Sequence, residues 1–260
     1  MGFRVHALPL IQEIRRHLPD RPTCYLIGTQ DCSFTYREVQ KRYPSQFRRA
    51  AKEIENMKDR CDINTLYSLF DFESVKTVDM NDRADIRLDL TRPVPEEYRE
   101  KADLVCDFGT LEHIFDVKEA IENMNRLLKT QGIILHMSPV SFYQHGFYNF
   151  NPLLFDTLYS LSGYEPILRT MNVTIYNPLY VIDTQKLSGW VKVFFSMTNK
   201  IFRNAILYRY NLPYSGKQNT RILSFFHFWA AHFRIPKNLM YCCAYRKCSS
   251  ELKIPYDVWP

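Results

Sequence analysis

The sequence has no apolar run near the roughly 20 residues that a membrane-spanning helix needs. Its seven cysteines include no CxxC pair and no zinc-ligand spacing, and their odd number does not match a complete disulfide framework. A secretory hydrophobic region, a GxSxG nucleophile elbow and a phosphate-binding P-loop are missing as well. These absences predict a cytoplasmic protein with reduced thiols that is neither a serine hydrolase of the α/β type nor a P-loop enzyme.

The composition predicts one folded α/β domain with an elaboration. Hydrophobic residues make up 46% of the 260 residues and aromatic residues 15%, which excludes wholesale disorder. The net charge of +6 is unevenly placed, because residues 171–260 hold twelve Lys or Arg against three acidic residues, a net +9. The basic character therefore belongs to the C-terminal part.

The most informative pattern is a strand, a carboxylate turn, a helix and a second strand in close succession. An apolar run over residues 103–107 precedes the polar turn 109–113. Apolar residues at helical spacing follow over 117–129, and Gly132 separates this helix from an apolar run over 133–137. In an open parallel sheet, ligands bind outside the carboxyl ends of the strands, so the turns after both strands are expected to line a pocket.

Two short motifs in this stretch carry a family resemblance. The turn Leu111-Glu112-His113, followed by the helix end Arg-Leu-Leu-Lys-Thr-Gln-Gly at 126–132, resembles the class I S-adenosylmethionine-dependent methyltransferases of the small-molecule, Leu-Glu-His type. The resemblance covers roughly residues 21–170 and 238–247. It implies a Rossmann-like, seven-stranded, mostly parallel sheet with helical insertions, and S-adenosylmethionine as the cofactor. It also implies methyl transfer to an oxygen or nitrogen of a small molecule or glycan precursor.

The first expected strand, 23–27, leads into a degenerate glycine loop. The family commonly has the form E-I-G-C-G-D-G-S-F here, and Gln30 and Cys32 replace its second and third glycines. Where glycine is needed for positive φ, a side chain costs roughly 1 kcal/mol or more. The resemblance implies that this loop contacts the cofactor through Gly28, Thr29 and Gln30. The alternative is a non-catalytic, methyltransferase-like scaffold or binding protein with a weakened cofactor site.

Further cofactor candidates lie at the ends of later strands. Residues 75–79 form an expected second strand, whose terminal carboxylate can accept hydrogen bonds from both ribose hydroxyls, although a solvated strand-end Asp is the alternative. Residues 86–90 form an expected third strand that presents a carboxylate and an amide to the adenine edge, with ordinary turn chemistry as the alternative. The candidates are Asp79, Met80, Asp89, Leu90, Asp107 and Gly109.

Three histidines lie near the mouth of the predicted pocket. An unperturbed imidazole titrates near neutral pH, so each could act as a base. His145, on the aromatic loop 138–150, is the preferred catalytic candidate, His113 is expected chiefly to fix its turn, and His136 is expected in the core. No metal site is expected, because no His and carboxylate cluster has ligand spacing along the chain.

The predicted organisation has four parts. They are an N-terminal helix in 1–20, a core over 21–170 with a helical insertion at about 36–72, a basic aromatic lid or insertion over 171–237, and a closing strand and tail over 238–260. The basic segment is expected to cover the substrate cleft as a packed lid, or to make peripheral contact with an anionic membrane surface on its inner, cytoplasmic face. Nucleic acid is not an expected partner.

Overall fold

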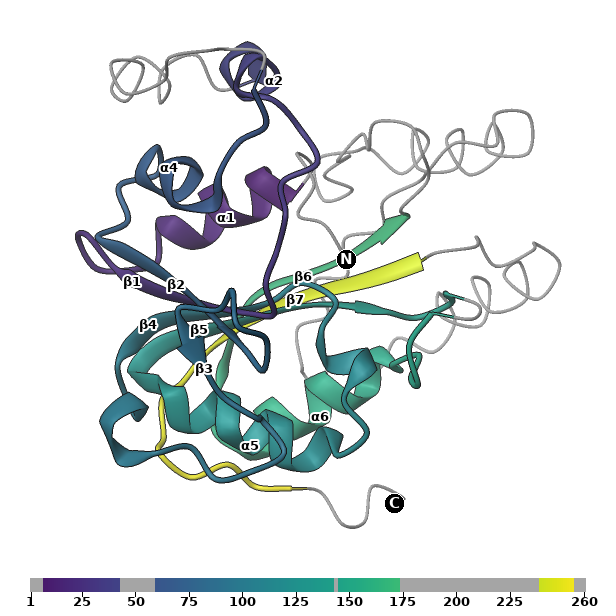
Figure 1. Ribbon diagram of the computed structural model, residues 1–260. Coiled ribbons are helices and arrows are strands. Elements are labelled where there is room, and N and C mark those ends of the chain that lie inside the picture. The colour runs from purple at the N-terminus through teal and green to yellow at the C-terminus, as the bar shows by residue number, and fades with distance from the viewer. Residues whose placement is uncertain (1–6, 43–58, 143–144, 174–238, 255–260) are drawn as a thin grey trace, which may run out of the picture.

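The computed structural model describes residues 7–42, 59–142, 145–173 and 239–254. Seven strands form one sheet in the order β3-β2-β1-β4-β5-β7-β6 (Figure 1). The strands are β1 (Thr23–Ile27), β2 (Ser74–Asp79), β3 (Ile86–Arg87), β4 (Ala102–Asp107), β5 (Leu128–Pro139), β6 (Glu165–Val173) and β7 (Leu239–Arg246). The first five pair in parallel, and β7 runs antiparallel to both β5 and β6. The predicted seven-stranded, mostly parallel sheet is confirmed.

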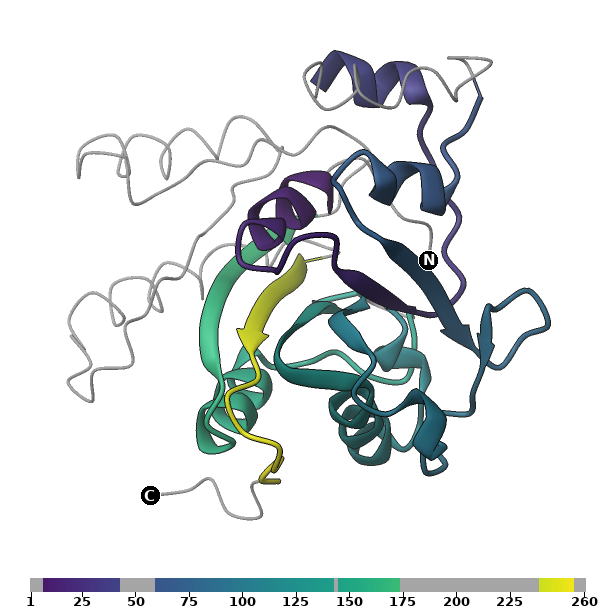
Figure 2. The same ribbon diagram turned by 90° about the vertical axis from the view of Figure 1, so that its left-hand side faces the viewer.

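Helices cover both faces of the sheet. The helices are α1 (Leu8–Arg15), α2 (Tyr36–Arg42), α4 (Ile63–Ser68), α5 (Val117–Leu127) and α6 (Pro152–Leu161), with short 3-10 turns η2 (Glu96–Tyr98) and η3 (Leu111–His113). Helices α1 and α4 lie on one face, and α5 and α6 on the other (Figures 1 and 2).

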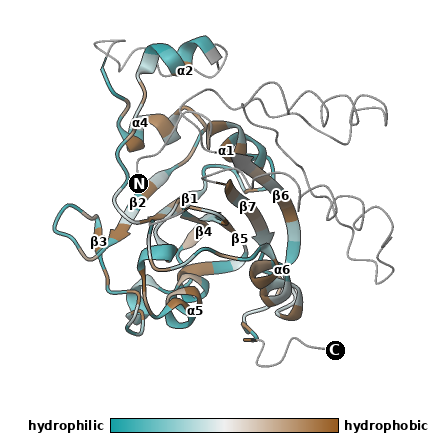
Figure 3. Cartoon of the chain, turned by 90° about the vertical axis from the view of Figure 1, so that its right-hand side faces the viewer, coloured by the Kyte–Doolittle hydropathy of each residue, from teal (hydrophilic) through white to brown (hydrophobic). Residues whose placement is uncertain are grey.

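Strand alternation divides the core between these two faces. In β1, Cys24 and Leu26 join the cluster under α1 and α4, whereas Tyr25 and Ile27 join the cluster under α5 and α6. Figure 3 shows β7 and α6 as largely hydrophobic. Because helices cover both faces of the sheet, polar side chains that bind a ligand are expected at the ends of the strands.

The helix predicted over 117–129 ends earlier than expected. Helix α5 stops at Leu127, and β5 begins with the next residue. Gln131, and not Gly132, takes the left-handed conformation, with φ +68°. Leu128 pairs with Ala102 of β4, and Gln131 N donates to the carbonyl of Lys247, next to the end of β7, at 2.7 Å. Contacts with both neighbouring strands therefore override the helical spacing of this segment.

The third strand is also shorter than predicted. Strand β3 contains two residues, whereas the apolar pattern indicated 86–90. The chain turns at Asp89, whose carboxylate accepts hydrogen bonds from the backbone and hydroxyl of Thr91.

Residues 43–58 of the predicted helical insertion and residues 174–238, which hold nearly all of the predicted lid, lie outside the described residues. Within the described ranges, no helix is long and apolar enough to cross a membrane.

Candidate cofactor and acceptor site

The Asp79 carboxylate joins the end of β2 to the loop after β1. Its Oδ2 accepts a hydrogen bond from Thr29 N at 2.7 Å, and its Oδ1 accepts one from Met80 N at 2.7 Å. Partial burial raises the pKa of Asp79, but the backbone hydrogen bonds outweigh it and hold the pKa below its ordinary value. The group is therefore an ionised, partly exposed carboxylate. The two amides leave it acceptor capacity for a ligand hydroxyl.

The glycines that follow β1 and β4 both have positive φ. Gly28 has φ +84° and Gly109 has φ +81°. A Cβ on Gly28 would lie 2.4 Å from Thr110 Oγ1. That hydroxyl donates to Ile27 O at 2.8 Å, so the turn after β4 is tied to the end of β1. Glycine is required at residue 28 by both its φ and this close approach.

The two residues that replace glycines do not strain the loop. Neither Gln30 nor Cys32 is among the positive-φ residues of the described chain. Cys32 is 5% exposed and belongs to the core under α1 and α4. Gln30 is 7% exposed, and its Oε1 has no hydrogen-bond partner among the described residues. The loop is thus rebuilt around these side chains. The Gln30 side chain places its Nε2 next to Gly28 and leaves its Oε1 as a buried acceptor.

The turn after β4 is organised by a fully buried Asp107. Its Oδ1 accepts a hydrogen bond from Thr110 N at 2.9 Å, and its Oδ2 lies 3.1 Å from Nδ1 of His136. The other imidazole nitrogen of His136 lies 2.6 Å from the hydroxyl of Tyr159 on α6. His136 has no exposed surface, which confirms that it is a core residue. The Asp107 carboxylate is fully used inside the fold, so a ligand at this edge would meet the backbone of the turn.

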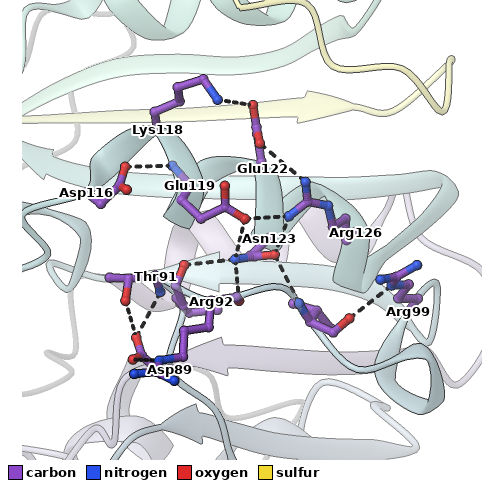
Figure 4. Close-up of polar contacts among 12 residues, drawn as sticks. Asp89, Thr91, Arg92, Arg99, Asp116, Lys118, Glu119, Glu122, Asn123 and Arg126 are labelled. Carbon is purple, nitrogen blue, oxygen red and sulfur yellow. Dashed lines mark hydrogen bonds and ion pairs between the residues drawn. The ribbon is translucent and has the colours of Figure 1, made fainter.

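The loop that carries Asp89 and Leu90 is held by a residue that the sequence did not single out. Asn123 on α5 is fully buried, and its Nδ2 donates to the carbonyls of Leu90 at 2.9 Å and Arg92 at 2.8 Å (Figure 4). Hydrogen bonds from Thr91 lower the pKa of Asp89. Asp89 therefore stabilises a turn, which was the alternative to an adenine contact. The adenine contact itself stays a prediction.

Glu112, His113 and His145 form a cluster at the ends of β4 and β5. The Glu112 side chain has no exposed surface, and neither carboxylate oxygen has a hydrogen-bond partner among the described residues. His145 Nε2 lies 3.4 Å from Glu112 Oε1, and the two histidine rings meet edge to face with centroids 4.9 Å apart. Burial, reinforced by the negative charge of Asp107, raises the pKa of Glu112 to about 8. Burial lowers the pKa of both histidines.

The loop after β5 is packed directly against this cluster. Gly146 has φ +70°, and a Cβ there would lie 2.7 Å from Glu112 O. Phe147 N donates to the same carbonyl at 2.7 Å. The exposed rings of Phe115 and Phe147 stand edge to face beside the loop, with centroids 5.9 Å apart. An apolar surface therefore adjoins a buried polar cluster.

The structure brings the predicted residues to one edge of the sheet. The candidates after β1, β2, β3 and β4, together with His145 after β5, all lie at carboxyl strand ends. Two features were not predicted from the sequence: the bonding roles of Thr110 and Asn123, and the lack of a hydrogen-bond partner for Glu112 within the described ranges. The Leu-Glu-His motif was the available signal for Glu112. A shallow depression of about 400 Å³ at the start of β2 lies at the opposite edge and contains none of these residues.

No protein-family model and no curated protein matches the sequence. Among solved structures, the chain is similar to a proposed methyltransferase from Bacillus halodurans, with 10% identity, a TM-score of 0.47, and coverage of 92% of this chain and 99% of that one. It is also similar to an S-adenosylmethionine-dependent methyltransferase from Archaeoglobus fulgidus, with 11% identity, a TM-score of 0.43, and coverage of 92% and 94%.

A third similar structure is phosphoethanolamine N-methyltransferase 2 from Haemonchus contortus in complex with S-adenosylmethionine. The identity is 12%, the TM-score 0.38, and the coverage 92% of this chain and 52% of that one. Seven strands in the order β3-β2-β1-β4-β5-β7-β6, with β7 antiparallel, form a Rossmann-like sheet of the class I methyltransferase fold.

Proposed function

We propose that the chain transfers the methyl group of S-adenosylmethionine to an oxygen or nitrogen of a small-molecule or glycan-type acceptor. One observation carries this proposal. Asp79 presents an ionised, partly exposed carboxylate at the end of β2, and the same carboxylate holds the loop that follows Gly28. A carboxylate in this place can accept hydrogen bonds from ribose hydroxyls.

The residues at this edge fit a nucleoside cofactor. Asp79 would hold the ribose, and the turn at Gly109 would contact the cofactor through its backbone. The buried Gln30 Oε1, which has no partner in the described part of the chain, would accept a hydrogen bond from a cofactor donor. Asp89 and the Leu90 amide would meet the adenine edge. When bound, S-adenosylmethionine supplies a methyl group already activated by the sulfonium.

The acceptor would lie on the His145 side of the site. Phe115 and Phe147 offer exposed aromatic surface there, and His113 and His145 offer polar atoms next to it. Small-molecule sites combine apolar walls with a few polar groups in this way. The main task of these residues is to orient the acceptor atom toward the methyl carbon, because alignment supplies much of the rate when the methyl is already activated.

A second candidate, a scaffold or binding protein without catalysis, is favoured by the crowding around Gly28. Thr110 Oγ1 and the Gln30 side chain both lie against that glycine. Incubation with cofactor labelled in the methyl group, together with a panel of hydroxyl and amine acceptors, separates the two functions. Labelled product supports the transferase. Saturable cofactor binding without any labelled product across the panel supports the binding protein.

A further inference from the structure

We propose that Glu112, His113 and His145 bind a divalent first-row transition metal ion of the zinc class. One ligand atom from each side chain lies within 4.8 Å of the others. In a tetrahedral zinc site with bonds near 2.1 Å, ligand atoms stand about 3.4 Å apart, so small side-chain rotations close the set around an ion. The sequence predicted no metal site because His145 is distant along the chain. The fold places it beside the Leu-Glu-His turn.

The second observation is a buried carboxyl group that accepts no hydrogen bond from any described residue. Glu112 has no exposed surface, and both of its oxygens, like His145 Nε2, lack a hydrogen-bond partner among the described residues. No described Lys or Arg forms an ion pair with it, and the basic groups near it are the imidazoles of His145 and His113. Buried polar groups are nearly always paired with protein, water or ions. Two buried carboxyl oxygens and an imidazole nitrogen that face one another without hydrogen bonds from the described part of the chain therefore favour a bound cation.

The donor set selects the kind of ion. Two imidazoles and one carboxylate suit zinc and its neighbours, whereas magnesium and calcium prefer sets built from oxygen. Three protein ligands leave at least one coordination position for water or for an acceptor atom. His113 is exposed and His145 is 23% exposed, which gives the ion a path from solvent to the buried carboxylate.

The ligands are held in place by their surroundings. Glu112 and His113 belong to η3, and Gly146 and Phe147 fix the neighbouring loop against the Glu112 backbone. The ring of Phe142 packs on His145 with centroids 4.3 Å apart. This support keeps the ligand atoms close before an ion arrives, which lowers the ordering cost of binding. The inference concerns metal binding alone and stands whether or not the chain transfers methyl groups.

Equilibrium dialysis of the whole chain with ZnSO₄, and visible absorption with CoCl₂, test the proposal. One ion is expected per chain, with cobalt d–d bands and no sulfur-to-cobalt charge-transfer band, because no cysteine belongs to the set. Glu112→Gln and His145→Asn should each weaken zinc binding at least 100-fold, since loss of an outer contact alone typically costs about 10- to 100-fold.

Matched controls come from an exposed carboxylate and histidine pair. Glu13 and His17 lie 3.9 Å apart on the surface, and Glu13→Gln and His17→Asn should leave zinc binding unchanged. Circular dichroism establishes that each variant is folded. His113→Asn supplies a third ligand change if Glu112→Gln fails to fold. The proposal is overturned if the chain binds neither ion, if the ligand variants bind as tightly as the parent, or if cobalt shows thiolate charge transfer.

Discussion

Replacing Asp79 by Ala should weaken S-adenosylmethionine binding without unfolding the protein. The carboxylate holds Thr29 N and Met80 N at 2.7 Å each, and both bonds are charge-assisted. Because the group is partly exposed, water can replace these bonds in part, so we expect a stability loss of about 1 to 2 kcal/mol. Loss of the ribose contact adds a separate cost to binding of about 1.5 to 3 kcal/mol, which is about 10- to 150-fold in Kd.

Titration calorimetry measures this effect, and two further variants interpret it. Asp79→Asn keeps the shape and removes the charge, so most of the loss should remain. Asp82→Ala removes an exposed carboxylate of the same loop that pairs with Arg87 at 2.9 Å, and it should leave cofactor affinity unchanged. If folded Asp79→Ala binds the cofactor as tightly as the parent chain, Asp79 does not contact the ribose and the assigned cofactor position is wrong.

Three further substitutions test hydrogen bonds and packing of the fold. Tyr159→Phe leaves the buried His136 Nε2 without its partner and should lower the free energy of unfolding in urea by about 1 to 3 kcal/mol. Tyr148→Phe loses an exposed hydrogen bond and should cost under about 0.5 kcal/mol. Equal costs would show that the contact between His136 and Tyr159 is not a buried hydrogen bond. Cys32→Gly should lower the melting temperature and leave cofactor affinity no tighter, because Cys32 fills core space; tighter binding would show that the loop is strained after all. Burial raises the pKa of Asp62, but hydrogen bonds from Thr65 outweigh it and hold the pKa below its ordinary value, so the stability that Asp62 contributes is present above about pH 4 and is lost as the pH falls through the folded pKa. The difference in unfolding free energy between the parent and Asp62→Asn should therefore shrink below about pH 4, and a difference that is constant from about pH 3 to 7 would contradict this.

The strands were predictable because apolar runs and terminal carboxylates are local signals. The predicted first strand matches β1 residue for residue, and Asp79 and Asp107 end their strands as expected. The length of β3 was not predictable from apolar residues, since the side chain of Asp89 competes for the backbone and turns the chain.

The Glu112 cluster depends on contacts that no local pattern contains. His145 reaches Glu112 only because Gly146 lies against the Glu112 backbone, an approach that needs both positive φ and the absence of a side chain. Asn123 likewise looks like a polar residue on a helix surface until its two carbonyl partners are known. Tertiary contacts between segments distant along the chain decided both features.

Titration of S-adenosylmethionine into the purified whole chain tests the central claim most directly. The expected result is saturable binding at one site per chain, weakened about 10- to 150-fold by Asp79→Ala and unaffected by Asp82→Ala. Absence of any saturable binding up to about 1 mM cofactor, the upper end of ordinary enzyme affinities for small substrates, would contradict the assignment of this strand edge as a cofactor site.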